Sequence, residues 1–290
     1  MTTKATACCK INIGLNIVSK REDGYHNLET IFYPVPLYDE ITISTAEKDG
    51  IDLAGHQLEG EPYENLVLKT VRLLRENGFK VPPVHISLKK NIPSGAGLGG
   101  GSSDAATVMK VLNKNLSLNL SNEAMERMIA KLGADCPFFI QCKPVYAEGI
   151  GDVFSPIELD LSGWHLVLVK PGDYISTKEA YSLIKAEPSK YSITEIVKRP
   201  VENWKEYINN DFEKSVFPYH PKIESIRNQL YEIGASYACM SGSGSTVFGL
   251  FRQKADLDKI DQDCFLFQCF LYSIRKFLPM NRKNPLSTCT

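Results

Sequence analysis

The stretch Pro93-Ser-Gly-Ala-Gly-Leu-Gly-Gly-Gly-Ser-Ser103 is the most informative part of this chain. Five of its eleven residues are glycine, which adopts positive φ angles at little steric cost, so successive N–H groups can converge on one anion. Ala105, Val108, Met109 and Leu112 follow at helical spacing, which predicts a helix directly after the glycines. The positive N-terminal end of such a helix favours phosphate, so we expect the loop to bind a nucleotide.

Other readings of the glycine loop fit the sequence less well. Gly95, Gly97 and Gly100 match the dinucleotide pattern G-x-G-x-x-G, but that fold needs a strand and an acidic residue about 20 positions later. Residues 113–122 read as a loop and a helix start, without an acidic residue. The Walker A pattern and the Val-Ala-Ile-Lys strand of protein kinases are absent from the sequence. A flexible linker is disfavoured, because a helix follows at once and Pro93 stiffens the entry.

Working outward from the loop, strands and helices are mixed without strict βαβ alternation, which predicts an α+β fold. A polar, irregular stretch at 155–163 marks a boundary between two domains. Alternating or short apolar runs predict strands at 10–18, 25–33, 40–45, 84–88, 145–149, 165–170, 236–240 and 246–250. Apolar residues at helical spacing and end signals predict helices at 65–77, after 103, at 124–132, from 176 and at 223–233.

Composition excludes several classes of function. The chain has 290 residues, with 33 Lys and Arg against 34 Asp and Glu, so it lacks the basic excess of proteins that bind nucleic acid by neutralising phosphates. No stretch approaches the 18 or more apolar residues that span a bilayer, and the first residues do not resemble a signal peptide. We therefore expect a cytoplasmic protein that binds neither nucleic acid nor a membrane.

Eight cysteines are present, an even number that invites a disulfide framework. A chain of this length can build a core without disulfides, and no secretory signal accompanies them. Their spacings lack the paired Cys and His ligands of a zinc site. We expect the thiols to be reduced.

Lys10 and Asp135 each have a structural and a catalytic interpretation. Lys10 begins an apolar strand, and the sequence alone favours a lysine exposed at a strand end. Asp135 follows a predicted helix and could cap a short helix with Pro137 in its first turn, or serve as a catalytic carboxylate. Similarly, Tyr25-His26 could be turn packing, and Ser241-Gly-Ser-Gly244 a plain hairpin turn.

Taken together, these segments resemble the GHMP small-molecule kinases. The motifs are Lys10-Ile-Asn12, Asp23-Gly-Tyr-His26, the glycine loop, Gly133-Ala-Asp-Cys-Pro137 and Ser241-Gly-Ser-Gly244, in the family's order and spacing. The resemblance covers about residues 5–268. It implies an N-terminal domain related to a ribosomal S5-like fold at 1–157, an α+β C-terminal domain at 158–268 and an active site in the interdomain cleft. Residues 269–290 form a tail without an assigned role.

The resemblance also implies ATP-dependent phosphoryl transfer to an alcohol, with Mg²⁺, and a role for each matching residue. Asp135 is implied as the base for the substrate hydroxyl, with Lys10 as its charged neighbour. Substrate contacts are implied for Asn12, Tyr25, His26, Tyr181, Ser241 and Gly242. Nucleotide contacts are implied for Asn65, Lys90, Pro93, Ser94, Gly95, Ala96, Gly97, Leu98, Gly99, Gly100, Gly101, Ser102 and Ser103, and by analogy Ser103 is also a candidate Mg²⁺ ligand.

The aromatic residues narrow the implied substrate. Tyr25, His26 and Tyr181 resemble the cytosine site of those family members that phosphorylate the 2-hydroxyl of a cytidine diphosphate-linked methylerythritol, in the non-mevalonate route to isoprenoids. Members acting on homoserine, mevalonate or sugars are the nearest alternative, but their substrates have no base to stack. A non-catalytic nucleotide-binding module is the alternative from another class, and the presence of both Lys10 and Asp135 disfavours it.

The sequence also departs from the family pattern. Cys8-Cys9 stands where members usually have Pro-Ala, and Cys9 and Cys136 adjoin the two implied catalytic residues. We therefore expect thiol modification at Cys9 or Cys136 to inhibit the activity.

Overall fold

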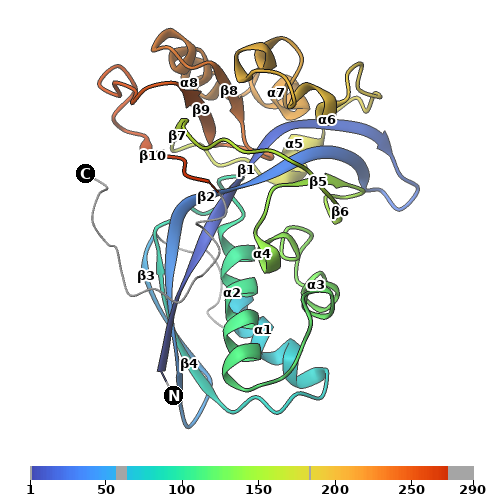
Figure 1. Ribbon diagram of the computed structural model, residues 1–290, viewed down its shortest axis with the longest axis vertical. Coiled ribbons are helices and arrows are strands. Elements are labelled where there is room, and N and C mark those ends of the chain that lie inside the picture. The colour runs from blue at the N-terminus through green and yellow to red at the C-terminus, as the bar shows by residue number, and fades with distance from the viewer. Residues whose placement is uncertain (1, 57–63, 183, 274–290) are drawn as a thin grey trace.

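The structure is a computed structural model that describes residues 2–56, 64–182 and 184–273. Two β-sheets, each with its own helices, occupy the lower and upper parts of Figure 1. This arrangement confirms the predicted two-domain α+β fold. Among the described residues, no helix combines the length and the apolarity needed to cross a membrane.

The N-terminal sheet is built around one long antiparallel pair, β1 and β2, which rises from the lower left of Figure 1 and bends across to the upper right. The strand order is β3-β4-β2-β5-β6, with β1 also paired to β2, and only β3 and β4 are parallel. The bounds are β1 (Thr2–Lys20), β2 (His26–Thr45), β3 (Gly50–Gly55), β4 (Val84–Lys90), β5 (Val145–Glu148) and β6 (Val153–Pro156).

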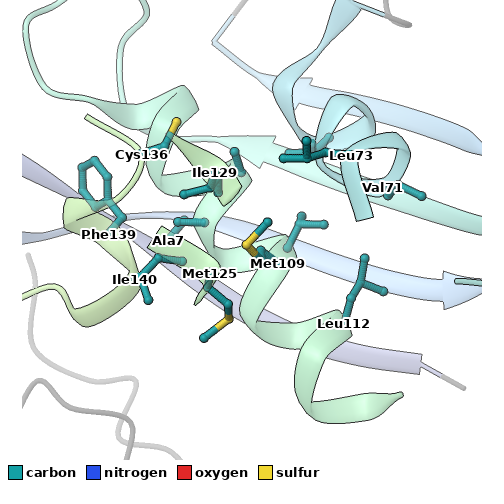
Figure 2. Packing of buried hydrophobic residues seen from close by; sticks show 14 of the residues in the cluster. Ala7, Val71, Leu73, Met109, Leu112, Met125, Ile129, Cys136, Phe139 and Ile140 are labelled. Carbon is teal, nitrogen blue, oxygen red and sulfur yellow. The ribbon is translucent and has the colours of Figure 1, made fainter. Parts of the chain in front are cut away.

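Four helices cover one face of this sheet: α1 (Leu66–Glu76), α2 (Gly100–Asn115), α3 (Asn122–Ile129) and α4 (Phe138–Gln141). Their buried apolar side chains meet Ala7 of β1 in one hydrophobic core, part of which is drawn in Figure 2. Cys136, just before α4, is fully buried in this core. At about 25 cal/mol for each Å² of apolar surface buried, such packing is the main force that holds the helices on the sheet.

The C-terminal domain has a four-stranded antiparallel sheet in the order β10-β7-β9-β8. The strand bounds are β7 (His165–Lys170), β8 (Tyr237–Met240), β9 (Val247–Phe251) and β10 (Phe265–Phe270). The helices are α5 (Thr177–Ser182), α6 (Ile193–Ile196), the 3₁₀ helix η2 (Val201–Glu206), α7 (Asp211–Val216) and α8 (Pro221–Glu232).

The second half of β1 extends into the C-terminal domain. Ile11 and Ile13 belong to a core shared with β7, β8 and β9, while the backbone N–H of Leu15 donates to Asn209 O at 2.9 Å. Gly14 takes a φ of +66°, and a Cβ there would lie 2.4 Å from Ile208 Cγ2. The close contact between β1 and the C-terminal domain therefore requires glycine at this position.

Most predicted elements are present, and several structural elements are additional. The strands predicted at 25–33 and 40–45 are parts of the single strand β2. The sequence patterns did not predict β3, β6, α6, η2, α7 or β10, and they raised α4 only as a short helix that Asp135 could cap. Strand β10 reaches Phe270, and the buried Leu271 donates its N–H to Trp164 O at 2.8 Å, so the ordered sheet extends beyond the boundary expected at 268. Residues 274–290 of the expected tail lie outside the described residues.

Candidate active site

Lys10 is buried in the middle of β1, with 3% of its surface exposed. Its Nζ donates to Asn12 Oδ1 at 2.5 Å and to Gly97 O at 2.8 Å, and it lies 3.6 Å from Asp135 Oδ2. The expectation of a lysine exposed at a strand end was wrong, because β1 is 19 residues long and the glycine loop covers this face of it. A buried ammonium must be paired or hydrogen-bonded, and Lys10 is both.

The glycine loop lies against β1 and against the C-terminal domain. Leu98 O accepts a hydrogen bond from Lys10 N at 3.0 Å, which fixes the loop to the strand. Gly97 has a φ of +71°, and a Cβ there would lie 2.0 Å from Ser241 O of the turn between β8 and β9. Only glycine permits this approach. The loop therefore contacts both domains.

The first turn of α2 follows the loop and is available to an anion. The helix starts after Gly99, which has a left-handed backbone and provides no side-chain cap. The first N–H groups of a helix have no intrahelical acceptors, and the helix dipole adds positive potential there. Asn65, the N-cap of α1, accepts from Val67 N at 3.1 Å, and the next residue, Leu66, packs beside Gly101.

A buried ionic cluster supports the glycine loop. Lys90 is 2% exposed and pairs with Asp39 and with Asp104, the latter at 2.6 Å. Asp39 also accepts from the backbone N–H groups of Asn91 and Ile92, at 2.6 and 2.8 Å, just before the loop begins. The Lys90 ammonium thus bonds to the carboxyl groups of two aspartates beneath the loop. Burial and the neighbouring Asp39 raise the pKa of Asp104 to about 8, against the opposing effect of Lys90.

Asp135 faces Lys10 from the turn between α3 and α4, and its side chain is 34% exposed. The N-cap of α4 is Pro137, and that helix has no side-chain cap. The alternative interpretation of Asp135 as a helix cap was therefore wrong. A carboxylate beside a buried ammonium, open to solvent on its other side, can accept a proton from a bound hydroxyl group.

A chain of hydrogen bonds orients the groups around Lys10. The amide of Asn12 donates through Nδ2 to Thr30 Oγ1 at 3.0 Å, and Thr30 donates to Gly14 O at 2.5 Å. This leaves Asn12 Oδ1 facing Lys10. Ser241 is fully buried; its hydroxyl accepts from Asn12 N at 3.1 Å and donates to Gly97 O at 2.9 Å.

The next residue, Gly242, also lies in this arrangement. A Cβ on Gly242 would be 3.4 Å from Asn12 Oδ1, and its carbonyl accepts from Asn210 Nδ2 at 2.8 Å. The turn from the C-terminal domain is thereby held against Asn12 and the glycine loop.

Aromatic rings of β2 and α5 pack against each other. The rings of His26 and Tyr181 stack with centroids 4.9 Å apart, and Tyr181 meets Phe212 edge-on at 4.8 Å. Tyr25 is 61% exposed. Burial raises the pKa of Tyr181, and the charge of Asp135 raises it further. The structure therefore brings two of the three predicted aromatic residues together and leaves Tyr25 open to solvent.

Several residues of this arrangement were missed by sequence reasoning. Asp104 directly follows the glycine loop, and this position next to the motif is a sequence signal that could have identified it. Asp39 and Thr30 carry no local signal, because their partners are 51 and 18 residues away in the sequence. Cys9 and Cys136 are fully buried, and burial raises the pKa of Cys136 to about 11. This burial does not favour the expected modification of these two thiols in the folded protein.

Two protein-family models match this chain. The family model for the GHMP kinases N terminal domain matches residues 65–143, and that for the GHMP kinases C terminal domain matches residues 192–263. The chain belongs to the GHMP kinase family and is an ATP-dependent small-molecule kinase.

Two relatives of this chain share one description. A 4-diphosphocytidyl-2-C-methyl-D-erythritol kinase of Bacteroides fragilis is 55% identical over 264 residues, which is 89% of this chain and 96% of that protein. The enzyme of the same description from Bacteroides thetaiotaomicron is 51% identical over 265 residues, 90% of this chain and 96% of that protein.

A crystal structure of 4-(cytidine 5'-diphospho)-2C-methyl-D-erythritol kinase superposes with a TM-score of 0.72 at 30% identity, over 86% of this chain and 90% of that one. A homoserine kinase from Cytophaga hutchinsonii superposes with a TM-score of 0.64 at 14% identity, over 93% and 95% of the two chains, and shares the fold.

Proposed function

We propose that this kinase transfers the γ-phosphoryl group of ATP to the 2-hydroxyl of 4-diphosphocytidyl-2-C-methyl-D-erythritol, in the non-mevalonate route to isoprenoid precursors. The stacked His26 and Tyr181 rings carry this proposal, because an aromatic surface suits a flat base. The names of the relatives that cover nearly the whole chain support it.

Asp135 acts as the base in this proposal. It takes the proton of the 2-hydroxyl while the hydroxyl oxygen bonds to the γ-phosphorus, and the bond from that phosphorus to the bridging oxygen of ADP breaks. Lys10, 3.6 Å from Asp135, offsets the negative charge of the transferred group. Phosphoryl transfer depends mainly on such positioning and charge stabilisation, and kinases turn over at about 1–100 per second.

The glycine loop and the start of α2 hold the phosphates. The backbone N–H groups of residues 94–102, which include the start of α2, supply donors, and Asn65 lies at the neighbouring helix start. Lys90 acts from beneath, by fixing Asp39 and Asp104 below the loop. Lys90 is therefore better placed to support the loop than to contact a phosphate group directly.

Mg²⁺ accompanies the triphosphate in this proposal. The described residues contain no cluster of three or more His, Cys, Asp or Glu side chains that could hold a metal ion. Mg²⁺ typically binds substrate phosphates with one or two protein ligands, so a site with few protein donors fits it. The hydroxyl of Ser103, in the first turn of α2, is the proposed protein ligand. The ion would neutralise charge on the phosphates.

The cytosine would stack on an aromatic ring. The exposed Tyr25 offers an open face, and His26 can hydrogen-bond the base edge from its place beside Tyr181. Stacking is worth about 1–3 kcal/mol per base but accepts any base, so selection for cytosine falls to hydrogen bonds. Asn12, Ser241 and Gly242 adjoin the hydroxyl side of the site.

ATP consumption with three acceptors tests the proposed function. The cytidyl compound should be phosphorylated, whereas homoserine and mevalonate, offered at the same concentration, should give only the background rate. Phosphorylation at the 2-hydroxyl is checked by phosphorus NMR of the product. No turnover with the cytidyl compound, or equal turnover with homoserine, would refute this substrate assignment.

A further inference from the structure

Two cysteine sulfur atoms lie unusually close beside the candidate active site. Cys8 Sγ of β1 and Cys142 Sγ at the end of α4 are 2.8 Å apart, although 134 residues separate them in the sequence. A disulfide bond is about 2.05 Å long, so the two atoms are within an ångström of bonding distance. Both side chains are half-buried, which leaves them open to a small oxidant.

The backbone holds Cys142 in place. It ends α4 in the left-handed region, with a φ of +53°, and its N–H donates to Phe138 O at 2.9 Å. Lys110 of α2 also holds α4 in place, since its Nζ donates to Phe139 O at 2.7 Å. The short distance between the sulfurs is therefore set by two anchored elements rather than by a free loop.

The two thiols have different tendencies to ionise. The hydrogen bond with Cys8 lowers the pKa of Cys142 and the positive charge of Lys110 lowers it further, against the effect of burial. The same hydrogen bond and burial raise the pKa of Cys8. A thiolate is the form that reacts with oxidants, so Cys142 is suited to react first and Cys8 second.

We propose that Cys8 and Cys142 are a redox-sensitive pair that a peroxide converts reversibly into a disulfide. The Cys142 thiolate attacks the peroxide oxygen, the O–O bond breaks, and hydroxide leaves as Cys142 becomes a sulfenic acid. The Cys8 sulfur then attacks the Cys142 sulfur, an S–S bond forms, and water leaves with the proton of Cys8. The two sulfurs lose two electrons in total and the peroxide gains them. This step is independent of phosphoryl transfer.

Four other cysteines lack these conditions. Cys9, Cys136 and Cys239 are at most 1% exposed, and burial is the main cause that raises the pKa of each. Cys264 is 8% exposed and lies in the C-terminal domain, before β10. It therefore provides a control position away from the pair.

Thiol counting and mass mapping test the pair directly. Reduced protein is treated with hydrogen peroxide while folded, then unfolded and titrated for thiols. The eight cysteines should give six reactive thiols, the intact mass should fall by about 2 Da for the two hydrogens lost, and a peptide pair linking Cys8 to Cys142 should appear. Dithiothreitol should restore all eight thiols.

Matched variants separate the pair from general oxidation. Cys264→Ser should lose two thiols at the rate of the parent protein. Cys8→Ser should form no disulfide and should instead accumulate a Cys142 sulfenic acid that dimedone traps. Eight thiols remaining in the peroxide-treated parent, or a disulfide formed at the same rate in Cys8→Ser, would overturn the proposal.

Discussion

The carbonyl oxygen of Gly97 accepts hydrogen bonds from side chains of both domains. Lys10 Nζ and Ser241 Oγ both donate to it, at 2.8 and 2.9 Å. A carbonyl oxygen has two lone pairs, so both bonds can form together. A change at any of these three groups therefore disturbs the other two.

The role of Asp135 can be tested by a neutral isostere. Asp135→Asn should lower kcat by about 10²–10⁴-fold, the usual contribution of a positioned acid or base, while ATP binding is retained. Steady-state kinetics and a nucleotide titration measure the two effects. Asp256→Asn is the control, because Asp256 is an exposed residue of the C-terminal domain whose carboxylate accepts from Asp258 N in a local turn. Comparable activity of Asp135→Asn and the control would remove Asp135 from the role of base.

Tyr25 tests the cytosine site. Tyr25→Ala should raise KM for the cytidyl substrate by about tenfold or more and change kcat little, because stacking of about 1–3 kcal/mol is lost equally from ground and transition states. Tyr219→Ala, at a similarly exposed tyrosine in the C-terminal domain, is the control. An unchanged KM for Tyr25→Ala would contradict stacking on this ring.

Thr30 tests the orientation of Asn12. Thr30→Val keeps the shape of the side chain but removes the partner of Asn12 Nδ2, which leaves a buried amide group unpaired. At about 1–3 kcal/mol for such a loss, kcat should fall by about tenfold or more, with a smaller change in KM for ATP. Thr30→Ser should restore most of the rate. Equal kinetics for the Val and Ser variants would show that the hydroxyl has no positioning role.

Helix α2 combines an N-terminal end that has no side-chain cap with a buried carboxyl group, that of Asp104. In the folded protein Asp104 keeps its proton up to about pH 8, whereas an unfolded aspartate ionises near pH 4. Folding therefore takes up a proton above about pH 4, and this group's contribution to stability falls as the pH rises toward 8.

Asp104→Asn should remove this pH-dependent cost. We expect the difference in the free energy of unfolding, variant minus parent protein, to be larger at pH 8 than at pH 5. The variant should therefore gain stability relative to the parent protein as the pH rises. Urea unfolding at the two pH values measures this difference. A variant that loses more stability at pH 8 than at pH 5 would show that Asp104 is needed as a carboxylate beside Lys90.

Elements with strong local signals could be predicted from the sequence. Helix α1 has an apolar face and an N-cap at Asn65, which accepts from Val67 N at 3.1 Å. Strand β10 could not be predicted, because five of its six side chains are half-buried and successive residues show no alternation. Helices α6 and α7 span only four and six residues, too short for a helical period to be visible.

The candidate active site is formed by contacts between distant elements, which local sequence patterns do not reveal. The motifs marked Lys10 and Asp135 as candidates, but their 3.6 Å separation depends on how β1 and the turn before α4 pack. The sequence favoured an exposed Lys10 because the predicted strand began at residue 10, whereas β1 begins at Thr2 and the glycine loop covers Lys10. The Lys90 cluster was hidden for the same reason, since both carboxylates come from other elements.

Global stability should depend on His220. Its ring contacts Glu179 Oε1 at 3.0 Å and Asp173 Oδ1 at 3.3 Å, and these carboxylates, Glu179 foremost, raise its pKa above 6.5. A raised histidine pKa stabilises the fold below about pH 6.5, and the effect is lost as the pH rises through the folded value. Because Glu179 is half exposed, the stabilisation should be less than about 1 kcal/mol.

His220→Gln should therefore lower the thermal unfolding midpoint at pH 6 and leave it nearly unchanged at pH 9. Scanning calorimetry at both pH values measures this. Equal destabilisation at the two values would indicate that the ring acts through packing and not through charge.

Strand β1 has one more consequence, for the cooperativity of unfolding. Ala7 packs in the core with α1 to α4, Ile11 and Ile13 in the core shared with the second sheet, and Leu15 and Ile17 in a third cluster with α7 and α8. One continuous strand thus contributes to every hydrophobic core that the structure describes. The two domains cannot separate as independent folding units without exposing apolar residues of β1 to water. An N-terminal fragment ending at residue 157 would leave the second half of β1 without its packing partners. The whole kinase should therefore unfold in a single transition.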